Sequence, residues 1–423
     1  MPGGGEGLGT VAERRLKLPS GIDLVGRHDE RPRLRHALAF AALVLAVLLW
    51  GIARLASGSV ADGAFFLVVA IALVVVTVAT ASVLVGYLLR PHRAPQLTPA
   101  ERHALRADPE GALAQQAQRV RRLGAPLGRP AADQPFAERS HRGDAETLSL
   151  IETNRVAEAH LTEGWLDAIV APREVTLTAE DGCELAAHVF ECALDSSRWA
   201  VLVHGYGGGW TDVMLYARHY AALGFNLLVP DLRAHGASGG RRPGLGWLDR
   251  TDLVEWCRWI VRNEDEGARI VLHGQGAGGA AACIAAGEKT LPSGVVACVC
   301  DSAYSDAWNG LARLLRAKGA PVHPTLDAIR AVYLLMPGGF DLALASAADA
   351  AAHAQVPLLL FQGERDAIVP PYMAKKIYDA ASGAAAGDNR RLRMFRGAGH
   401  LESALVDPAT YYHELRDFLK PLV

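Results

Sequence analysis

The chain has 423 residues and a formal net charge of −2, and 50% of its residues are hydrophobic. This length allows a large core and more than one structural unit. A charge so close to zero, without a basic stripe, excludes a nucleic-acid binding surface. The six cysteines lack CxxC spacing, so they indicate neither a disulfide framework nor a zinc site.

The amino-terminal segment 1–36 is basic and rich in glycine, and it is expected to be disordered. Residues 37–90 contain two uncharged apolar runs, 37–53 and 64–89, separated by a short turn. A mean hydropathy of +0.13 for the whole chain agrees with membrane segments. The pattern predicts two transmembrane helices in a hairpin that contacts the lipid bilayer. The alternative is a pair of buried core helices, which an apolar surface all round each helix disfavours.

Arginines flank the hairpin unevenly. Arg27, Arg31, Arg33 and Arg35 precede the first run, and Arg90 and Arg93 follow the second. The connecting turn has only Arg54. The positive-inside rule therefore places both termini in the cytoplasm. We predict a two-span protein of the cell membrane with a cytoplasmic carboxyl-terminal domain.

Residues 91–171 are predicted to form a helical linker region, in which the helix-period apolar positions of 147–166 pack onto the next domain. From residue 172 to 423, short apolar runs alternate with amphipathic segments. Strands are expected at 175–178, 185–190, 199–203, 226–230, 269–272, 294–300, 356–361 and 391–395, and helices at 212–223, 251–262 and 408–419. This alternation predicts an α/β domain with a mostly parallel sheet covered by helices on both faces.

Small and polar residues follow five of the predicted strands. These segments are 204–209, 231–238, 274–278, 363–370 and 397–400. In a parallel sheet, ligands bind at the carboxyl ends of the strands. Segment 274–278 has the G-x-S-x-G frame of a nucleophile elbow, except that Gly276 occupies the serine position.

With these motifs in this order, residues 172–423 resemble the α/β-hydrolase superfamily, and most of all its bacterial membrane-anchored esterase and serine-aminopeptidase-like branch. The resemblance implies a catalytic histidine at His400, oriented by Asp366. It also implies an oxyanion hole formed by the backbone N–H groups of Tyr206 and Ala277. The segment 304–352 would form a small helical lid that sets substrate choice.

Gly276 departs from the family pattern because the hydroxyl is missing. Serine in the positive-φ conformation of an elbow is strained by about 1–3 kcal/mol, whereas glycine adopts that conformation freely. The exchange therefore keeps the turn and deletes the chemistry. Ser302 and Cys283 are the candidate substitute nucleophiles, and direct activation of water by Asp366 and His400 is a further route.

Other polar residues of these loops have simpler expected roles. His204 and His235 are expected to hydrogen-bond loop backbone, and Asp231 and Arg233 to form an ion pair or loop brace. No metal or organic cofactor is implied.

The sequence thus predicts a membrane-anchored α/β-hydrolase-family protein, catalytically weak or inactive, that retains a pocket for a small ester, amide or acyl ligand. One alternative is an active serine-independent hydrolase that uses the Asp366–His400 dyad. The other is a membrane scaffold that docks protein partners.

Overall fold

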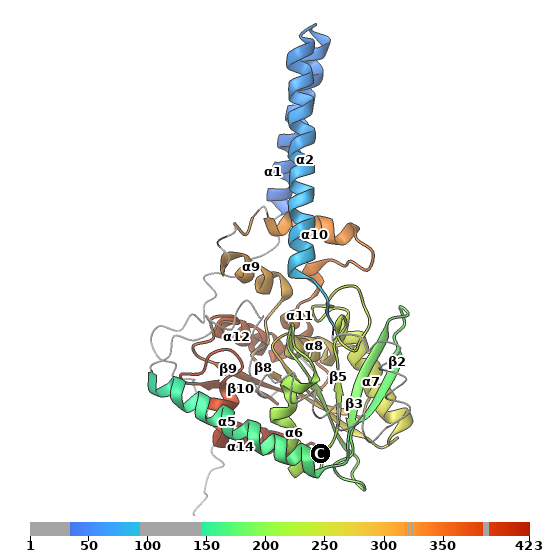
Figure 1. The fold of residues 1–423 in the computed structure, drawn as a ribbon, viewed down its shortest axis with the longest axis vertical. Helices are drawn as coiled ribbons and strands as arrows, with labels where there is room; N and C mark the ends of the chain where they lie inside the picture. Colours follow the sequence, from blue (N-terminus) through green and yellow to red (C-terminus); the bar gives the residue numbers. More distant parts are fainter. Residues whose placement is uncertain (1–33, 94–144, 318, 320, 324, 384–388) are drawn as a thin grey trace, which may run out of the picture.

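The computed structural model describes residues 34–93, 145–317, 319, 321–323, 325–383 and 389–423. The predicted disordered segment 1–36 lies almost wholly outside this part of the chain, and so does most of the predicted linker 91–171. Within the described residues, an amino-terminal pair of helices stands on an α/β domain (Figure 1).

The amino-terminal helices α1 (Leu34–Ala56) and α2 (Val60–Leu88) run antiparallel and pack along their length (Figure 1). Two buried glycines allow their close approach. A Cβ atom added to Gly63 would lie 2.8 Å from the carbonyl oxygen of Gly51, which is closer than real contacts allow. Small residues of this kind are typical of helix pairs that pack within membranes.

The two helices differ in their capacity to cross a bilayer. In α2, the 27 residues Val60–Gly86 are long and apolar enough to span a membrane. In α1, the apolar part Ala41–Ala56 is shorter than such a span. Two packed helices are therefore present, but by length and composition the described residues contain one candidate span, so the predicted transmembrane hairpin is not confirmed.

The domain is built on an eight-stranded sheet whose order is β10-β9-β8-β7-β4-β5-β3-β2. Only β3 runs opposite to the other strands, because it is antiparallel to both β2 and β5, so the predicted mostly parallel sheet is confirmed. The strands are β2 (Arg173–Thr178), β3 (Glu184–Phe190), β4 (Arg198–Val203), β5 (Asn226–Pro230), β7 (Arg269–Gln275), β8 (Val295–Asp301), β9 (Leu358–Gly363) and β10 (Arg390–Phe395).

Helices cover both faces of this sheet and enclose two apolar clusters. One face carries α7 (Asp249–Asn263), α8 (Ala277–Ala286) and α12 (Pro371–Ala380). The other carries α6 (Met214–Ala222) with the preceding turn η2 (Trp210–Val213), and α14 (Pro408–Leu419). As predicted, a helix before residue 172 packs onto the domain: α5 (Ala145–Ala168) contacts α6 and α13 (Ser403–Val406).

A group of short helices connects β8 to β9 and occupies the predicted lid segment. It consists of α9 (Ala307–Ala317), α10 (Thr325–Leu335), η3 (Leu342–Leu344) and α11 (Ala347–Ala351), while η4 (Ala381–Gly383) follows α12. Helix α10 packs against the end of α2, where Val85 and Leu89 are buried in the same apolar cluster as Leu326 and Ile329 (Figure 1). The chain then pairs β1 (His92–Arg93) with β6 (His235–Gly236), in the loop after β5.

Candidate active site

Strand β7 ends at Gln275 and α8 begins at Ala277, so Gly276 alone makes the turn between them. Its φ of +55° lies in the left-handed region, and its N–H donates to the carbonyl of Asp301 at 2.8 Å. The flanking glycines are required by space. A Cβ atom added to Gly274 would lie 2.2 Å from the carbonyl oxygen of Gly278. A Cβ atom added to Gly278 would lie 2.3 Å from the carbonyl oxygen of His204.

Gly276 differs from its flanking glycines because a side chain fits there. A Cβ atom at this position would lie 3.6 Å from Nε2 of His400 and 3.8 Å from Cα of Gly205, both ordinary contacts. A serine hydroxyl, one bond further out, would reach hydrogen-bonding distance of that nitrogen. The turn between β7 and α8 therefore has room for a side chain that would face His400.

The histidine and the aspartate come together as the resemblance implies. Nδ1 of His400 lies 2.8 Å from Oδ2 of Asp366, whose side chain is buried. The other carboxylate oxygen accepts the N–H groups of Ile368 and Val369 at 2.9 and 2.7 Å. These bonds fix the carboxylate, which in turn fixes the imidazole with Nε2 toward Gly276.

Sequence reasoning missed two polar residues near this pair. Gln362, the polar residue near the end of β9, donates from Nε2 to Oδ2 of Asp366 at 3.2 Å. Asp301, at the end of β8, is fully buried, and its carboxylate accepts hydroxyl hydrogen bonds from Tyr216, Tyr411 and Ser302, each at 3.0 Å. A polar residue that ends an otherwise apolar strand is the signal that could have identified both.

Burial opposes a charge on His400, but the Asp366 carboxylate and its hydrogen bond outweigh burial, with smaller contributions from Asp301 and Glu402. The pKa of His400 is therefore raised above its ordinary value. This shift stabilises the fold below the unfolded-state pKa of about 6.5, and the contribution is lost as the pH rises through the folded-state value.

We expect the Asp366→Asn substitution to lower the pKa of His400, because burial would then act without the opposing carboxylate. Titration of the His400 Cε1–H resonance by NMR, with selectively labelled histidine, measures the shift. The Asp181→Asn variant, which changes an exposed carboxylate that pairs with Arg233, should leave the pKa of His400 unchanged. A His400 pKa that stays the same in Asp366→Asn would contradict the pairing.

The loop after β4 is braced by two histidines, as predicted. His204 accepts the N–H of Leu232 at Nε2 (2.9 Å), and its Nδ1 lies 2.7 Å from the carbonyl of Gly205. His235 accepts the N–H of Gly207 at Nε2 (3.0 Å). These bonds hold the backbone around Tyr206 beside the elbow, and Ala277 begins α8 on the other side. The oxyanion role of these two N–H groups stays a prediction.

Arg233 and Asp231 brace the loop after β5, but not by pairing with each other. Buried Arg233 forms a bidentate ion pair with Asp252 of α7, with N–O distances of 2.7 and 2.6 Å, and a further bond to Asp181 at 2.5 Å. Asp231 instead accepts the N–H groups of Trp210 and Ala237 at 3.2 and 2.8 Å. The ion-pair partner could not be predicted because it lies on a helix 19 residues further along the chain.

Neither candidate substitute nucleophile is placed to attack a ligand. Ser302 is buried, donates its hydroxyl to Asp301 and accepts the N–H of Leu401 at 3.2 Å. Cys283 is buried in α8 and donates to the carbonyl of Ala347. Hydrogen bonding with Cys300, together with burial, raises the pKa of the Cys283 thiol well above its ordinary value, so it stays protonated.

The described residues contain no cluster of histidine, cysteine or acidic side chains that could hold a metal ion. Two shallow surface depressions of about 300 and 240 Å³ lie near the amino ends of the strands, beside Asn226 and Arg269 respectively. Both are remote from Gly276 and His400, because these lie at the carboxyl ends.

Comparison with known proteins agrees with this architecture. Residues 200–414 match the model of the alpha/beta hydrolase family. The uncharacterized protein YqkD of Bacillus subtilis is 24% identical over 226 residues, which cover 53% of this chain and 72% of YqkD.

Two solved structures are similar to this chain at low identity. The esterase Pf2001 of Pyrococcus furiosus is 22% identical, with a TM-score of 0.48, over 60% of this chain and 94% of the esterase. The acylaminoacyl peptidase of Pyrococcus horikoshii is 16% identical, with a TM-score of 0.47, over 61% of this chain and 43% of the peptidase. Since the family model matches half of the sequence, from β4 into α14, this chain belongs to the α/β-hydrolase family.

Proposed function

We propose that this chain is a membrane-anchored α/β-hydrolase-family protein that binds a small ester, amide or acyl ligand beside His400 and has weak or no hydrolytic activity. One observation carries this proposal. Gly276 has room for a side chain 3.6 Å from His400, yet it carries no hydroxyl, while the Asp366–His400 pair keeps its hydrogen bond.

Loss of the nucleophile removes the covalent route. In a serine hydrolase the hydroxyl attacks the carbonyl carbon and the histidine takes its proton. Without the hydroxyl no acyl-enzyme forms, and serine loss in a comparable triad lowers kcat by about 10⁶, leaving about 10³–10⁴ over water. Since Ser302 and Cys283 are both buried and hydrogen-bonded elsewhere, neither restores that route.

Membrane anchoring is supported by the surface of α2. Its outward side chains are apolar over most of the helix and include Phe65, Ile71 and Val83, each more than half exposed. An exposed apolar surface of this extent is expected to contact lipid. For a hairpin that spans the membrane twice, arginines on both outer flanks would by the positive-inside rule favour a cytoplasmic hydrolase-fold domain.

A second candidate is a serine-independent hydrolase, and the intact Asp366–His400 pair favours it. In that case His400 would take a proton from a water molecule at the position of the missing hydroxyl. The raised pKa of His400 would shift the activity of this route toward higher pH, because only the neutral imidazole acts as a base.

Hydrolysis of a p-nitrophenyl acetate, butyrate and octanoate panel by the full chain in lipid nanodiscs distinguishes the two candidates. We expect the native chain and the His400→Ala variant to give the same low rate. A native rate that falls about a hundredfold in His400→Ala, the usual size of a general-base effect, would establish the serine-independent hydrolase instead.

A further inference from the structure

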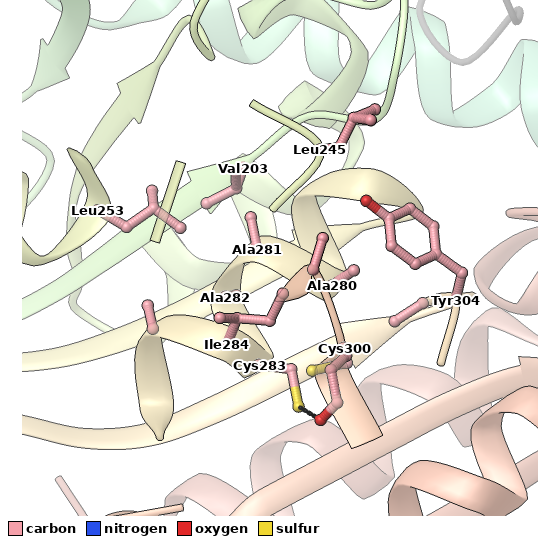
Figure 2. Packing of buried hydrophobic residues seen from close by; sticks show 14 of the residues in the cluster. Val203, Leu245, Leu253, Ala280, Ala281, Ala282, Cys283, Ile284, Cys300 and Tyr304 are labelled. Carbon is pink, nitrogen blue, oxygen red and sulfur yellow. Dashed lines mark hydrogen bonds between the residues drawn. The ribbon is translucent and has the colours of Figure 1, made fainter. Parts of the chain in front are cut away.

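The two sides of the lid have different surroundings. Its inner side packs on the domain, where Figure 2 shows the ring of Tyr304, at the start of the lid segment, beside Ala280 of α8. Its outer side is the end of α10 and the turn that follows. There Leu334 and Leu335 are 45% and 88% exposed in the described part of the chain. The domain therefore covers the inner side of the lid and leaves these two leucines at the surface.

The exposed surface extends beyond the two leucines. Ile329 and Tyr333 of α10 are buried, because they face the apolar cluster beneath the lid. The opposite face of the helix end and the next turn expose only uncharged residues: Ala331, Leu334, Leu335, Pro337 and Gly338. Residues three and four apart share a face of a helix, so the first three of these form one apolar patch. An exposed apolar patch of this kind is expected to contact a partner.

The contact between α10 and α2 fixes the depth of this patch relative to a bilayer. Asp62 is the last charged residue before an uncharged stretch of α2 that continues to its end. A bilayer core takes about 20 helical residues, so a core that begins at Gly63 ends near Ser82. Val85 and Leu89, which are buried against the lid, then lie about 5–10 Å past that boundary. The headgroup region is about 5–7 Å thick on each side, so α10 lies at headgroup depth.

A cation lies beside the exposed leucines. Arg242, in the loop before α7, is half-buried, and its Nη1 donates to the carbonyl of Pro337 at 3.4 Å. The central carbon of the same guanidinium lies 6.0 Å from the centre of the Tyr333 ring. A guanidinium has five N–H donors, so Arg242 keeps donors for a phosphate oxygen. Apolar side chains flanked by basic ones are typical of surfaces that lie in a bilayer interface.

We infer that the outer side of the lid is a second membrane contact, in which Leu334 and Leu335 enter the headgroup region and Arg242 binds a lipid phosphate. The inference rests on the membrane anchor of the proposed function, because α2 sets the depth of the lid. It adds that the lid itself touches lipid. The lipid-facing surface then passes from Val83 of α2, which is 71% exposed, to the end of α10.

Quenching by nitroxide-labelled lipid tests this contact in the full chain in nanodiscs. The fluorescent amino acid Anap replaces Leu335 in one chain, Leu194 in a second and Phe65 in a third, and each chain is first matched to the native chain by its unfolding temperature. Leu194 is the matched control, because it is 89% exposed but lies before β4, near the amino ends of the strands. Phe65, 62% exposed at the other end of α2, reports the anchor. The lipid carries its nitroxide near the ester end of the acyl chain, at the depth expected for both ends of α2.

We expect the nitroxide to quench positions 335 and 65 at least about threefold more than position 194, because an interfacial side chain lies about 5–10 Å into the headgroup boundary. Quenching at position 65 without quenching at position 335 would overturn the lid contact and leave the anchor in place. A blue-shifted but unquenched emission at position 335 would mean that protein covers the patch, which also overturns the contact. If neither position is quenched, the membrane anchor fails as well.

Discussion

Replacing Gly276 by serine should raise esterase activity of the full chain at least about 10³-fold above the native chain, since serine loss in a comparable triad costs about 10⁶ in kcat. The added Cβ fits 3.6 Å from Nε2 of His400, and Asp366 already orients that ring. The hydroxyl would complete a nucleophile, base and acid in contact. Release of p-nitrophenol and covalent labelling of the introduced serine by a fluorophosphonate measure the gain.

The Gly276→Ala variant is the matched control for that experiment. It introduces the same Cβ into the same positive-φ turn, so both variants should lose about 1–2 kcal/mol of stability, but alanine supplies no nucleophile. Adding His400→Ala to Gly276→Ser should abolish the gain. A Gly276→Ser chain that unfolds at the same temperature as Gly276→Ala, yet gains no activity and no label, would contradict the assignment of position 276 as the elbow.

The Arg233→Ala substitution should destabilise the domain by about 3–5 kcal/mol, the usual cost of breaking a buried ion pair. Only 6% of each side chain of Arg233 and Asp252 is exposed, and the pair is bidentate. Removal of the guanidinium leaves the Asp252 carboxylate buried without its cation. Urea unfolding of the full chain in nanodiscs, followed by tryptophan fluorescence, measures the loss.

The Asp181→Ala variant is the matched control, because Asp181 binds the same guanidinium from an exposed position, with 55% of its side chain exposed. An exposed ion pair contributes about 0–1 kcal/mol, so this variant should unfold almost like the native chain. Equal destabilisation by the two variants would mean that Arg233 does not stabilise the buried carboxylate of Asp252.

Apolar strands and the turns after them were predictable from sequence because each is a local pattern. The strand at 226–230 and the helix at 408–419 have the expected bounds, and most other elements differ by a few residues. The elbow was predictable because the spacing of its glycines reflects a steric need: at Gly274 and Gly278 a Cβ atom would strike backbone.

Long-range pairing was not predictable from these patterns. The partner of Arg233 on α7, and the support of Asp366 by Gln362, depend on which helices and strands become neighbours. The apolar character of the sequence also did not show whether the first helix is long enough to span a membrane. The run at 37–53 is uncharged, but the corresponding apolar part of α1, Ala41–Ala56, is short for a bilayer, whereas α2 is long enough.

The packing of α10 on the end of α2 has a consequence for how this protein would meet its ligand. Val85 and Leu89, at the end of α2, are buried among lid residues, and β1 pairs with β6 of the domain directly afterwards. For a chain anchored as proposed, the lid would be held at the membrane surface. A ligand dissolved in that leaflet would then reach the site by diffusion within the membrane.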